Sequence, residues 1–437
     1  MPQVAFHTLG CKVNQYETEA MIDLFKDADY NIVNFQNSAD VYIINSCTVT
    51  NQAASKSRKK ARRAKRRNPE ARVIMVGCYP QAFPEEVQDV EEIDYFIGAE
   101  GKKDIVKQVE EIIRTDEKKD IYINKYDEIT DYEALEVDRV TETTRANVKI
   151  EDGCNQFCSY CIIPYARGPV RSREENSIIK EVKSFIDKGI KEIVLTGTHL
   201  GNYGLDKDNN NALSELVEKL TQLDGDFRIR LSSIEVTEID ERLIELLSKK
   251  EKLCPHLHIP LQSGSNEVLD AMRRPYHRND FRNTVKILRS NIPEISITTD
   301  VMVGFPGETD KNFNETCEFI KEIEFSRLHV FPFSVREGTP ASNMGDRVHG
   351  DVKKERSKEL RKLNRDLMLK YQKKFINQVR NVIIEDKRDY DTELLTGVTD
   401  NYLRILVEDE DKYQGNMVRV KLIKSHDYEN VFGKIVD

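Results

Sequence analysis

The 437-residue sequence has no tryptophan, no internal repeat and no low-complexity tract other than short runs of charge. It also lacks a long hydrophobic run, because no apolar stretch approaches the roughly 18 residues that a membrane-spanning helix needs. The first residues lack the basic and apolar regions of a signal peptide. We therefore expect a cytoplasmic protein without a membrane partner. No Walker pattern is present, which argues against a P-loop nucleotide site.

The sequence has no excess of positive charge either. It contains 67 Lys and Arg against 76 Asp and Glu, a net charge of −9, so a nucleic-acid site would have to be a local basic surface. Hydrophobic residues make up 39% of the chain and charged residues 33%, which provides enough apolar material for buried cores. At about 150 residues per domain, the length predicts roughly three domains.

The first part of the chain predicts an α/β domain. Short apolar runs alternate with helical stretches, a pattern typical of a parallel sheet covered on both faces. The charged, poorly periodic segment that follows predicts a linker. We place this domain at residues 1–113 and the linker at residues 114–145. The expected strands are Val4–Thr8, Val41–Asn45, Val73–Val76 and Tyr95–Ile97.

The alternation of strands and helices resumes at residue 146. Six βα units are fewer than the eight of a closed TIM barrel, which predicts a partial, curved (β/α)6 barrel over residues 146–375. A long basic helix is expected over 351–377, and a small β-barrel over 376–437. The expected central strands are Asn147–Ile150, Glu192–Leu195, Arg228–Ser232, Leu257–Leu261, Ile297–Val303 and Leu328–Phe333; those of the last domain are Val382–Ile384, Arg404–Val407 and Met417–Ile423.

Three of the eight cysteines form a CxxxCxxC motif, Cys154, Cys158 and Cys161, directly after the first strand of the central domain. Disulfides rarely persist in a reducing cytosol, so metal or redox chemistry is the leading interpretation. A [4Fe–4S] cluster normally takes four Cys ligands, and three ligands leave one iron open to a small molecule. The alternatives are a zinc site with a further ligand and three incidental cysteines.

A second triplet, Cys11, Cys47 and Cys78, is spread over the N-terminal domain. Each cysteine follows the carboxyl end of a predicted parallel strand, and those ends share one edge of a sheet, where ligands bind. The three thiols can therefore meet and hold another cluster with three protein ligands. The alternative is that they are buried small hydrophobic residues, which is the interpretation we give to Cys254 and Cys317.

Lys56–Arg67 holds nine basic side chains in twelve positions and predicts a phosphate-binding surface. A solvated helix face is the alternative, and the 351–377 helix is a second basic surface. The C-terminal domain weakens a simple RNA-binding interpretation of its barrel, because residues 379–437 contain nine Lys or Arg against thirteen Asp or Glu. Either the barrel makes its contacts through a local patch around Lys421 and Lys424, or most of the RNA affinity lies elsewhere in the chain.

The CxxxCxxC motif at the head of six βα units resembles the radical S-adenosylmethionine superfamily. Together with the second triplet and the terminal barrel, the whole chain resembles a methylthiotransferase with an N-terminal cluster domain, a radical domain and a TRAM domain. The stretches 7–14 (HTLGCKVN), 331–334 (FPFS) and 397–402 (GVTDNY) look closest to the branch that methylthiolates N6-threonylcarbamoyladenosine. Sister branches act on isopentenyladenosine in tRNA or on an aspartate of a ribosomal protein.

The resemblance implies two [4Fe–4S] clusters and S-adenosylmethionine as cofactors. The cluster at Cys154, Cys158 and Cys161 would bind S-adenosylmethionine and cleave it to a 5′-deoxyadenosyl radical, which abstracts hydrogen from adenine C2 at position 37 of tRNA. Sulfur held at the other triplet would be transferred as a methylthio group. The implied partners are tRNA and a reducing protein such as a flavodoxin or ferredoxin, and not DNA. A non-catalytic iron–sulfur protein that binds RNA is the remaining alternative.

The resemblance also implies contacts to S-adenosylmethionine after successive strands of the central domain. Barrel-type enzymes gather their sites at such carboxyl ends. The plain alternative is ordinary turn and helix-start chemistry, as at Gly304, Gly307 and Glu308. The expected cofactor contacts are Thr196, Gly197, Ser233, Glu235, Gln262, Asp300 and Gly304.

Overall fold

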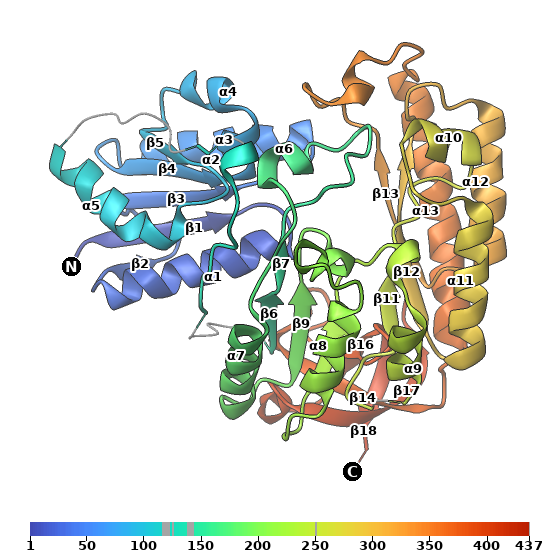
Figure 1. Cartoon of the computed structure of the whole chain (residues 1–437). Helices are drawn as coiled ribbons and strands as arrows, with labels where there is room; N and C mark the ends of the chain where they lie inside the picture. Colours follow the sequence, from blue (N-terminus) through green and yellow to red (C-terminus); the bar gives the residue numbers. More distant parts are fainter. Residues whose placement is uncertain (116–122, 125, 138–143, 250, 437) are drawn as a thin grey trace.

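The computed structural model describes residues 1–115, 123–124, 126–137, 144–249 and 251–436. Figure 1 shows an α/β sheet domain, a half-barrel of parallel strands and a small closed barrel, in this order along the chain. The predicted α/β architecture is confirmed. Among the described residues, no helix is both long and apolar enough to cross a membrane.

The N-terminal sheet is parallel and has the order β2-β1-β3-β4-β5. Helix α2 packs its alanines on one face, while α1 and α5 cover the other. All four expected strands form, and β2 is an additional edge strand too short to give a pattern. The elements are β1 (Gln3–Thr8), α1 (Lys12–Asp27), β2 (Asn31–Val33), β3 (Val41–Ser46), α2 (Asn51–Arg67), β4 (Arg72–Gly77), α3 (Cys78–Ala82), α4 (Pro84–Gln88), β5 (Tyr95–Ile97) and α5 (Ile105–Thr115).

The segment expected to be a linker begins inside α5, which ends at Thr115. Its positions 116–122, 125 and 138–143 lie outside the described residues. Leu135 and Val137 are buried in the core of the central domain. The part of the segment around Leu135 and Val137 therefore packs against the half-barrel.

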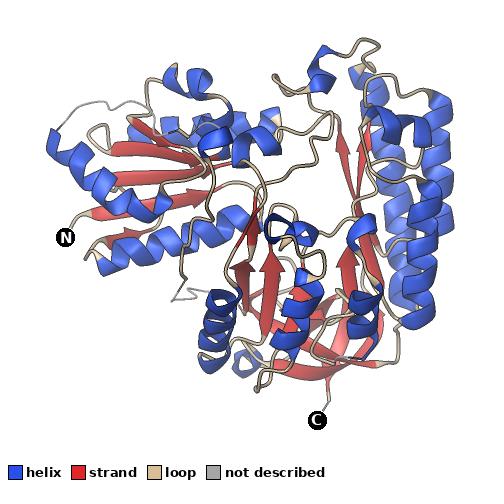
Figure 2. Cartoon of the chain, viewed as in Figure 1, coloured by secondary structure: helices blue, strands red, loops and turns tan. Residues whose placement is uncertain are grey.

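The six expected central strands pair in parallel as two sheets, β10-β9-β6 and β11-β12-β13. Bridges from Ile229 to Leu253 and from Ser233 to His258 join the sheets into one half-barrel. Helices cover its outer side (Figure 2). The strands are β6 (Arg145–Lys149), β9 (Glu192–Thr196), β10 (Arg228–Leu231), β11 (His256–His258), β12 (Ser296–Val303) and β13 (Arg327–Pro332); the outer helices are α7 (Glu175–Asp187), α8 (Ala212–Thr221), α9 (Glu241–Lys249), α11 (Arg278–Asn291), α12 (Asp310–Ile323) and α13 (Gly350–Lys373).

Three short elements shape the carboxyl end of the half-barrel. A two-stranded pair, β7 (Glu151–Asp152) with β8 (Arg171–Ser172), follows β6 and encloses α6 (Ile163–Arg167). Helix α10 (Asn266–Ala271) follows β11. These elements flank the CxxxCxxC motif.

The last domain is a closed barrel with the order β14-β15-β16-β18-β17, as expected. Its strands are β14 (Val379–Arg388), β15 (Leu395–Thr399), β16 (Arg404–Val407), β17 (Met417–Ser425) and β18 (Asn430–Ile435), of which β15 and β18 were not expected. It closes the amino-terminal end of the half-barrel. Arg228 and Arg230 of β10 donate hydrogen bonds to its backbone carbonyls, those of Asn381, Val398, Thr399 and Asp400.

Candidate active site

The CxxxCxxC motif lies in the loop between β7 and α6. Gly153 starts this loop with φ +89°, and a Cβ there would lie 1.8 Å from the carbonyl oxygen of Pro169. A side chain is therefore excluded at this turn. The backbone nitrogen of Cys154 donates to the carbonyl of Gly168 at 3.0 Å, which fixes the loop against the end of α6.

The three sulfurs of this loop are close enough to interact electrostatically. Burial, followed by the neighbouring thiolate of Cys158, raises the pKa of Cys161 to about 12. Burial also raises the pKa of Cys158. Burial thus disfavours the thiolate forms of Cys158 and Cys161, and the positive charge of a bound iron cluster would favour them. No three His, Cys, Asp or Glu side chains of the described residues are close enough to bind one metal ion together. This does not argue against a cluster, because in a cluster each thiolate binds a different iron.

Two further side chains contact these sulfurs. His199 Nδ1 lies 3.3 Å from Cys154 Sγ, and Arg274 donates to Cys158 Sγ at 3.1 Å. Arg274 also forms a buried ion pair with Glu235, one of the expected cofactor contacts. The sequence carries no signal for Arg274, because it lies 116 residues after Cys158.

The expected cofactor contacts lie at the same end of the half-barrel as the cysteine loop. Thr196 ends β9, and a Cβ on Gly197 would lie 2.5 Å from Glu151 Oε2. Asp300 on β12 lies 3.3 Å from His258 Nε2. The remaining positions, Ser233, Glu235, Gln262 and Gly304, follow β10, β11 and β12.

Several buried polar atoms at this end lack a partner within the described part of the chain. Ser232 Oγ, Gln262 Oε1 and Glu151 Oε1 are buried without a hydrogen bond. Gln262 also has φ +60°, a strained conformation that is held by backbone hydrogen bonds to β12. Unpaired buried polar groups are costly. The carboxyl end therefore fits a polar ligand such as S-adenosylmethionine.

The N-terminal triplet also comes together in space. Cys11, Cys47 and Cys78 follow β1, β3 and β4 at one edge of the sheet. A Cβ on Gly10, which has φ +118°, would lie 2.9 Å from Cys47 Cβ, so glycine permits this approach. Burial and then the thiolate of Cys78 raise the pKa of Cys47 to about 12. This donor set fits a second cluster.

Two arginines of the central domain hold the loops of this second triplet. Arg167, the last residue of α6, donates from Nε to Cys78 Sγ at 3.1 Å. Arg336 donates to the side chains of Thr48 and Asn51, just after Cys47. The CxxxCxxC loop thus leads directly into α6, and the last residue of α6 contacts Cys78 of the N-terminal triplet. Neither arginine has a signal in the sequence, because each lies far along the chain from the cysteine loop that it contacts.

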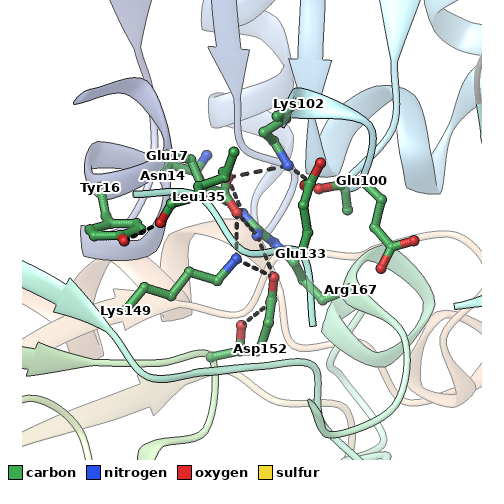
Figure 3. Close-up of polar contacts among 12 residues, drawn as sticks. Asn14, Tyr16, Glu17, Glu100, Lys102, Glu133, Leu135, Lys149, Asp152 and Arg167 are labelled. Carbon is green, nitrogen blue, oxygen red and sulfur yellow. Dashed lines mark hydrogen bonds and ion pairs between the residues drawn. The ribbon is translucent and has the colours of Figure 1, made fainter. Parts of the chain in front are cut away.

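Arg167 is part of a buried charge network between the two domains, drawn in Figure 3. Glu17 of α1 pairs with Arg167, with Lys149 at 3.0 Å and with Lys102 at 3.4 Å. Asp152 pairs with Lys149 at 2.6 Å and with Arg167 at 3.2 Å. Burial opposes ionisation of Glu17, but the three cations outweigh it and lower its pKa to about 2. The network fixes the N-terminal domain beside the half-barrel.

The basic run Lys56–Arg67 forms most of helix α2. Three of its cations are paired: Arg58 with Glu86, Arg62 with Glu92 and Lys65 with Asp94. Four other cations of the run are exposed, and their helical spacing places them on one face of α2. Within the described residues, these four cations have no ion-pair partner. We call these four residues the open α2 face: Lys56, Lys59, Arg63 and Arg66.

Comparisons with known proteins agree with this geometry. Residues 148–320 match the Radical SAM superfamily, and residues 3–98 match "Uncharacterized protein family UPF0004". The chain is 44% identical to the threonylcarbamoyladenosine tRNA methylthiotransferase MtaB of Bacillus subtilis, over 97% of this chain and 94% of that protein. It is 40% identical to the Aquifex aeolicus protein of the same name, over 96% and 99%.

A second group of relatives has a different substrate in its name. The tRNA-2-methylthio-N(6)-dimethylallyladenosine synthase of Clostridium tetani is 33% identical, over 96% of this chain and 93% of that protein. The structure of the radical S-adenosylmethionine methyltransferase TsrM from Kitasatospora setae shares the fold, with a TM-score of 0.59, 14% identity, and coverage of 78% of this chain and 77% of that one.

A CxxxCxxC loop at the carboxyl end of a parallel half-barrel, together with these matches, defines a radical S-adenosylmethionine enzyme. More narrowly, the chain belongs to the radical S-adenosylmethionine methylthiotransferases. Enzymes of this family carry two [4Fe–4S] clusters and use S-adenosylmethionine.

Proposed function

We propose that this protein transfers a methylthio group to C2 of N6-threonylcarbamoyladenosine, next to the anticodon of tRNA at position 37. The observation that carries the proposal is the contact of Arg167 with Cys78, which connects the helix that follows the CxxxCxxC loop to the N-terminal triplet. Near full-length identity of 40 to 44% to proteins named for this reaction supports the substrate.

In this proposal Cys154, Cys158 and Cys161 hold the cluster that binds S-adenosylmethionine, and Cys11, Cys47 and Cys78 hold the second cluster. The clusters, when bound, supply reductive cleavage of S-adenosylmethionine and the sulfur that is transferred. Arg274 orients Cys158 by its hydrogen bond and keeps Glu235 in place. The expected contacts that bind and orient S-adenosylmethionine are Thr196, Gly197, Ser233, Glu235, Gln262, Asp300 and Gly304.

The open α2 face binds tRNA phosphates in this proposal. Helix α2 begins four residues after Cys47, so its cations lie next to the edge of the sheet where the second triplet meets. A flavodoxin or ferredoxin supplies the electrons.

Dimethylallyladenosine in tRNA is the competing substrate, because relatives named for it are 33% identical over nearly the whole chain. Mass spectrometry of tRNA nucleosides from cells with and without this gene separates the two. Loss of the methylthio derivative of threonylcarbamoyladenosine is the expected result. Loss of the dimethylallyl derivative instead would overturn the proposal.

A further inference from the structure

A cavity of about 680 Å³ lies where all three domains meet. The N-terminal domain contributes side chains from the end of β1 and from α1, including Lys12, which directly follows Cys11. The half-barrel contributes inward-facing residues of β6, β9 and β10, among them Asn147, Val194 and Arg230. The terminal barrel contributes Tyr402 and the end of β14. The cavity therefore runs from beside Cys11 into the interior of the half-barrel.

Most of the side chains that line this cavity carry a polar or charged group. Eight of its sixteen residues are charged, and only Ile22 and Val194 are aliphatic. A dimethylallyl group would meet few aliphatic side chains there, and mainly the alkyl stems of charged ones. A charged substituent would find partners there.

The cavity is lined by four acidic side chains (Glu19, Glu192, Glu385 and Asp386) and four basic ones (Lys12, Arg145, Arg230 and Lys387), but basic groups gather around Glu192. This one carboxylate faces three guanidinium groups, those of Arg145 at 3.4 Å, Arg228 at 2.6 Å and Arg230 at 2.9 Å. Glu385 offsets part of the excess through its pair with Arg145 at 2.8 Å. Cations therefore outnumber carboxylates only in the part of the wall around Glu192, where Arg228 and Arg230 also donate to backbone carbonyls of the terminal barrel.

Lys12 adds a further cation, and no carboxylate of the described residues forms an ion pair with it. Its side chain is partly buried and lies within electrostatic range of Arg230, Arg145 and Glu192. In the described parts of the chain, its amino group has neither an ion pair nor a hydrogen bond. A cation held beside two others, inside a cavity and without a counter-ion, is stabilised when an anion enters.

We infer that this cavity binds the amino-acid substituent of the target nucleoside, with Lys12 as the counter-ion of its carboxylate. The inference rests on the proposed function, since threonylcarbamoyladenosine carries a free carboxylate and dimethylallyladenosine does not. Because Lys12 adjoins Cys11, a substituent bound in this way leaves the base on the side of the cysteine triplets. Lys12 is then a residue that selects the substrate.

The test measures binding of three anticodon stem-loop RNAs to the reconstituted holoenzyme. One RNA carries threonylcarbamoyladenosine, one carries its methyl ester, and one carries unmodified adenosine. The methyl ester nearly keeps the shape of the threonylcarbamoyl substituent but removes the negative charge of its carboxylate. The variants are Lys12→Gln, Lys12→Arg and, as a matched control, Lys26→Gln at the other end of α1, with equal iron content in all preparations.

The wild-type protein should bind the acid about tenfold or more tightly than the ester, as expected for a charged hydrogen bond. Lys12→Gln should reduce this ratio to about twofold or less, Lys12→Arg should restore most of it, and Lys26→Gln should leave it unchanged. The inference would be overturned if the wild-type protein bound the acid and the ester equally well. It would also be overturned if Lys12→Gln kept the wild-type ratio of acid affinity to ester affinity.

Nucleoside analysis separates failure of this inference from failure of the proposed function. If the wild-type enzyme methylthiolates threonylcarbamoyladenosine while Lys12→Gln keeps the full binding ratio, the inference alone is wrong. If the enzyme methylthiolates only dimethylallyladenosine, the proposed function is wrong as well.

Discussion

The Nε atom of Arg167 donates a hydrogen bond to the sulfur of Cys78 at 3.1 Å. Arg167 ends the helix that directly follows the CxxxCxxC loop, whereas Cys78 begins a helix of the N-terminal domain. One buried side chain therefore joins the loops of the two proposed clusters. Hydrogen bonds to sulfur and nearby charge are means by which a protein sets the reduction potential of an iron–sulfur cluster.

Replacing Arg167 by Gln should lower the reduction potential of the N-terminal cluster. The reduced cluster carries more negative charge, which the guanidinium stabilises. A fall of roughly 60 mV corresponds to a tenfold change in a one-electron equilibrium. The measurement is a redox titration followed by electron paramagnetic resonance, in a Cys154→Ala, Cys158→Ala, Cys161→Ala background that holds only this cluster. Arg274→Gln in the same background is the control, and an equal potential in both variants would refute the role of Arg167.

Replacing the three N-terminal cysteines by Ala should separate radical formation from sulfur transfer. This variant should bind about four iron atoms instead of about eight, still cleave S-adenosylmethionine, and form no methylthio product. The Cys154, Cys158, Cys161 triple variant should lose both reactions. Iron analysis and detection of 5′-deoxyadenosine test this. A folded N-terminal variant without any cleavage would show that the division of roles is wrong.

Glu17→Gln should destabilise the protein by about 3 to 5 kcal/mol, since it removes the buried carboxylate that pairs with Lys102, Lys149 and Arg167, of which only Lys149 and Arg167 also pair with Asp152. Urea unfolding measures the change. Glu70→Gln, at an exposed position of the same domain, should shift stability by no more than about 0.5 kcal/mol. Equal effects of the two substitutions would mean that the network does not stabilise the interface.

Glu151 makes stability depend on pH. Burial raises its pKa to about 8 in the folded protein. A carboxyl group whose folded pKa is raised binds a proton that the unfolded chain has released, so stability falls as pH rises from the ordinary pKa toward 8. Between pH 6 and pH 8 the loss from this group should be roughly 2 to 3 kcal/mol, and it should be absent in Glu151→Gln. Urea unfolding at both pH values tests this, and parallel profiles for the two proteins would contradict it.

The open α2 face should carry salt-dependent RNA binding. Changing Lys56, Lys59, Arg63 and Arg66 to Gln should reduce the slope of log affinity against log salt by about 2 or more, because each lost phosphate contact removes roughly 0.7 to 0.9. The matched control changes Arg58, Arg62 and Lys65, which already pair with carboxylates. If both variants alter the slope equally, the contribution is general charge and not this face.

Much of the fold was predictable from local pattern. The strand at Val41–Asn45 is buried on both faces. Its nearly continuous apolar sequence predicts this, because a strand with one solvent-exposed face would alternate apolar and polar residues. Strands β2, β15 and β18 were not predicted. Strand β2 has only three residues, and Gly397 and Gly433 interrupt the hydrophobic pattern of the other two. Pairing with neighbouring strands, which the local sequence does not show, decides these elements.

Tertiary contacts make the cations of the basic run Lys56–Arg67 differ from one another, because some pair with carboxylates and others stay exposed. By sequence, all nine cations of Lys56–Arg67 are equivalent, and Arg62 is as good a candidate for phosphate as Arg63. In the structure Arg62 lies 3.5 Å from Glu92, while Arg63 is exposed without an ion-pair partner in the described chain. The difference depends on carboxylates that approach from α4 and from the residues just before β5, namely Glu86, Glu92 and Asp94.

The six cysteines, their position after predicted strands and the three-domain order could all be read from the chain, because spacing and hydrophobic period are local properties. Which side chains complete the site depends on long-range packing. Arg167 reaches Cys78 across 89 residues, and Arg274 reaches Cys158 across 116. Lys12 lines a cavity whose other walls come from β9, β10 and the terminal barrel. A charged side chain gains its role from the groups that it meets on burial, and those groups come from distant parts of the chain.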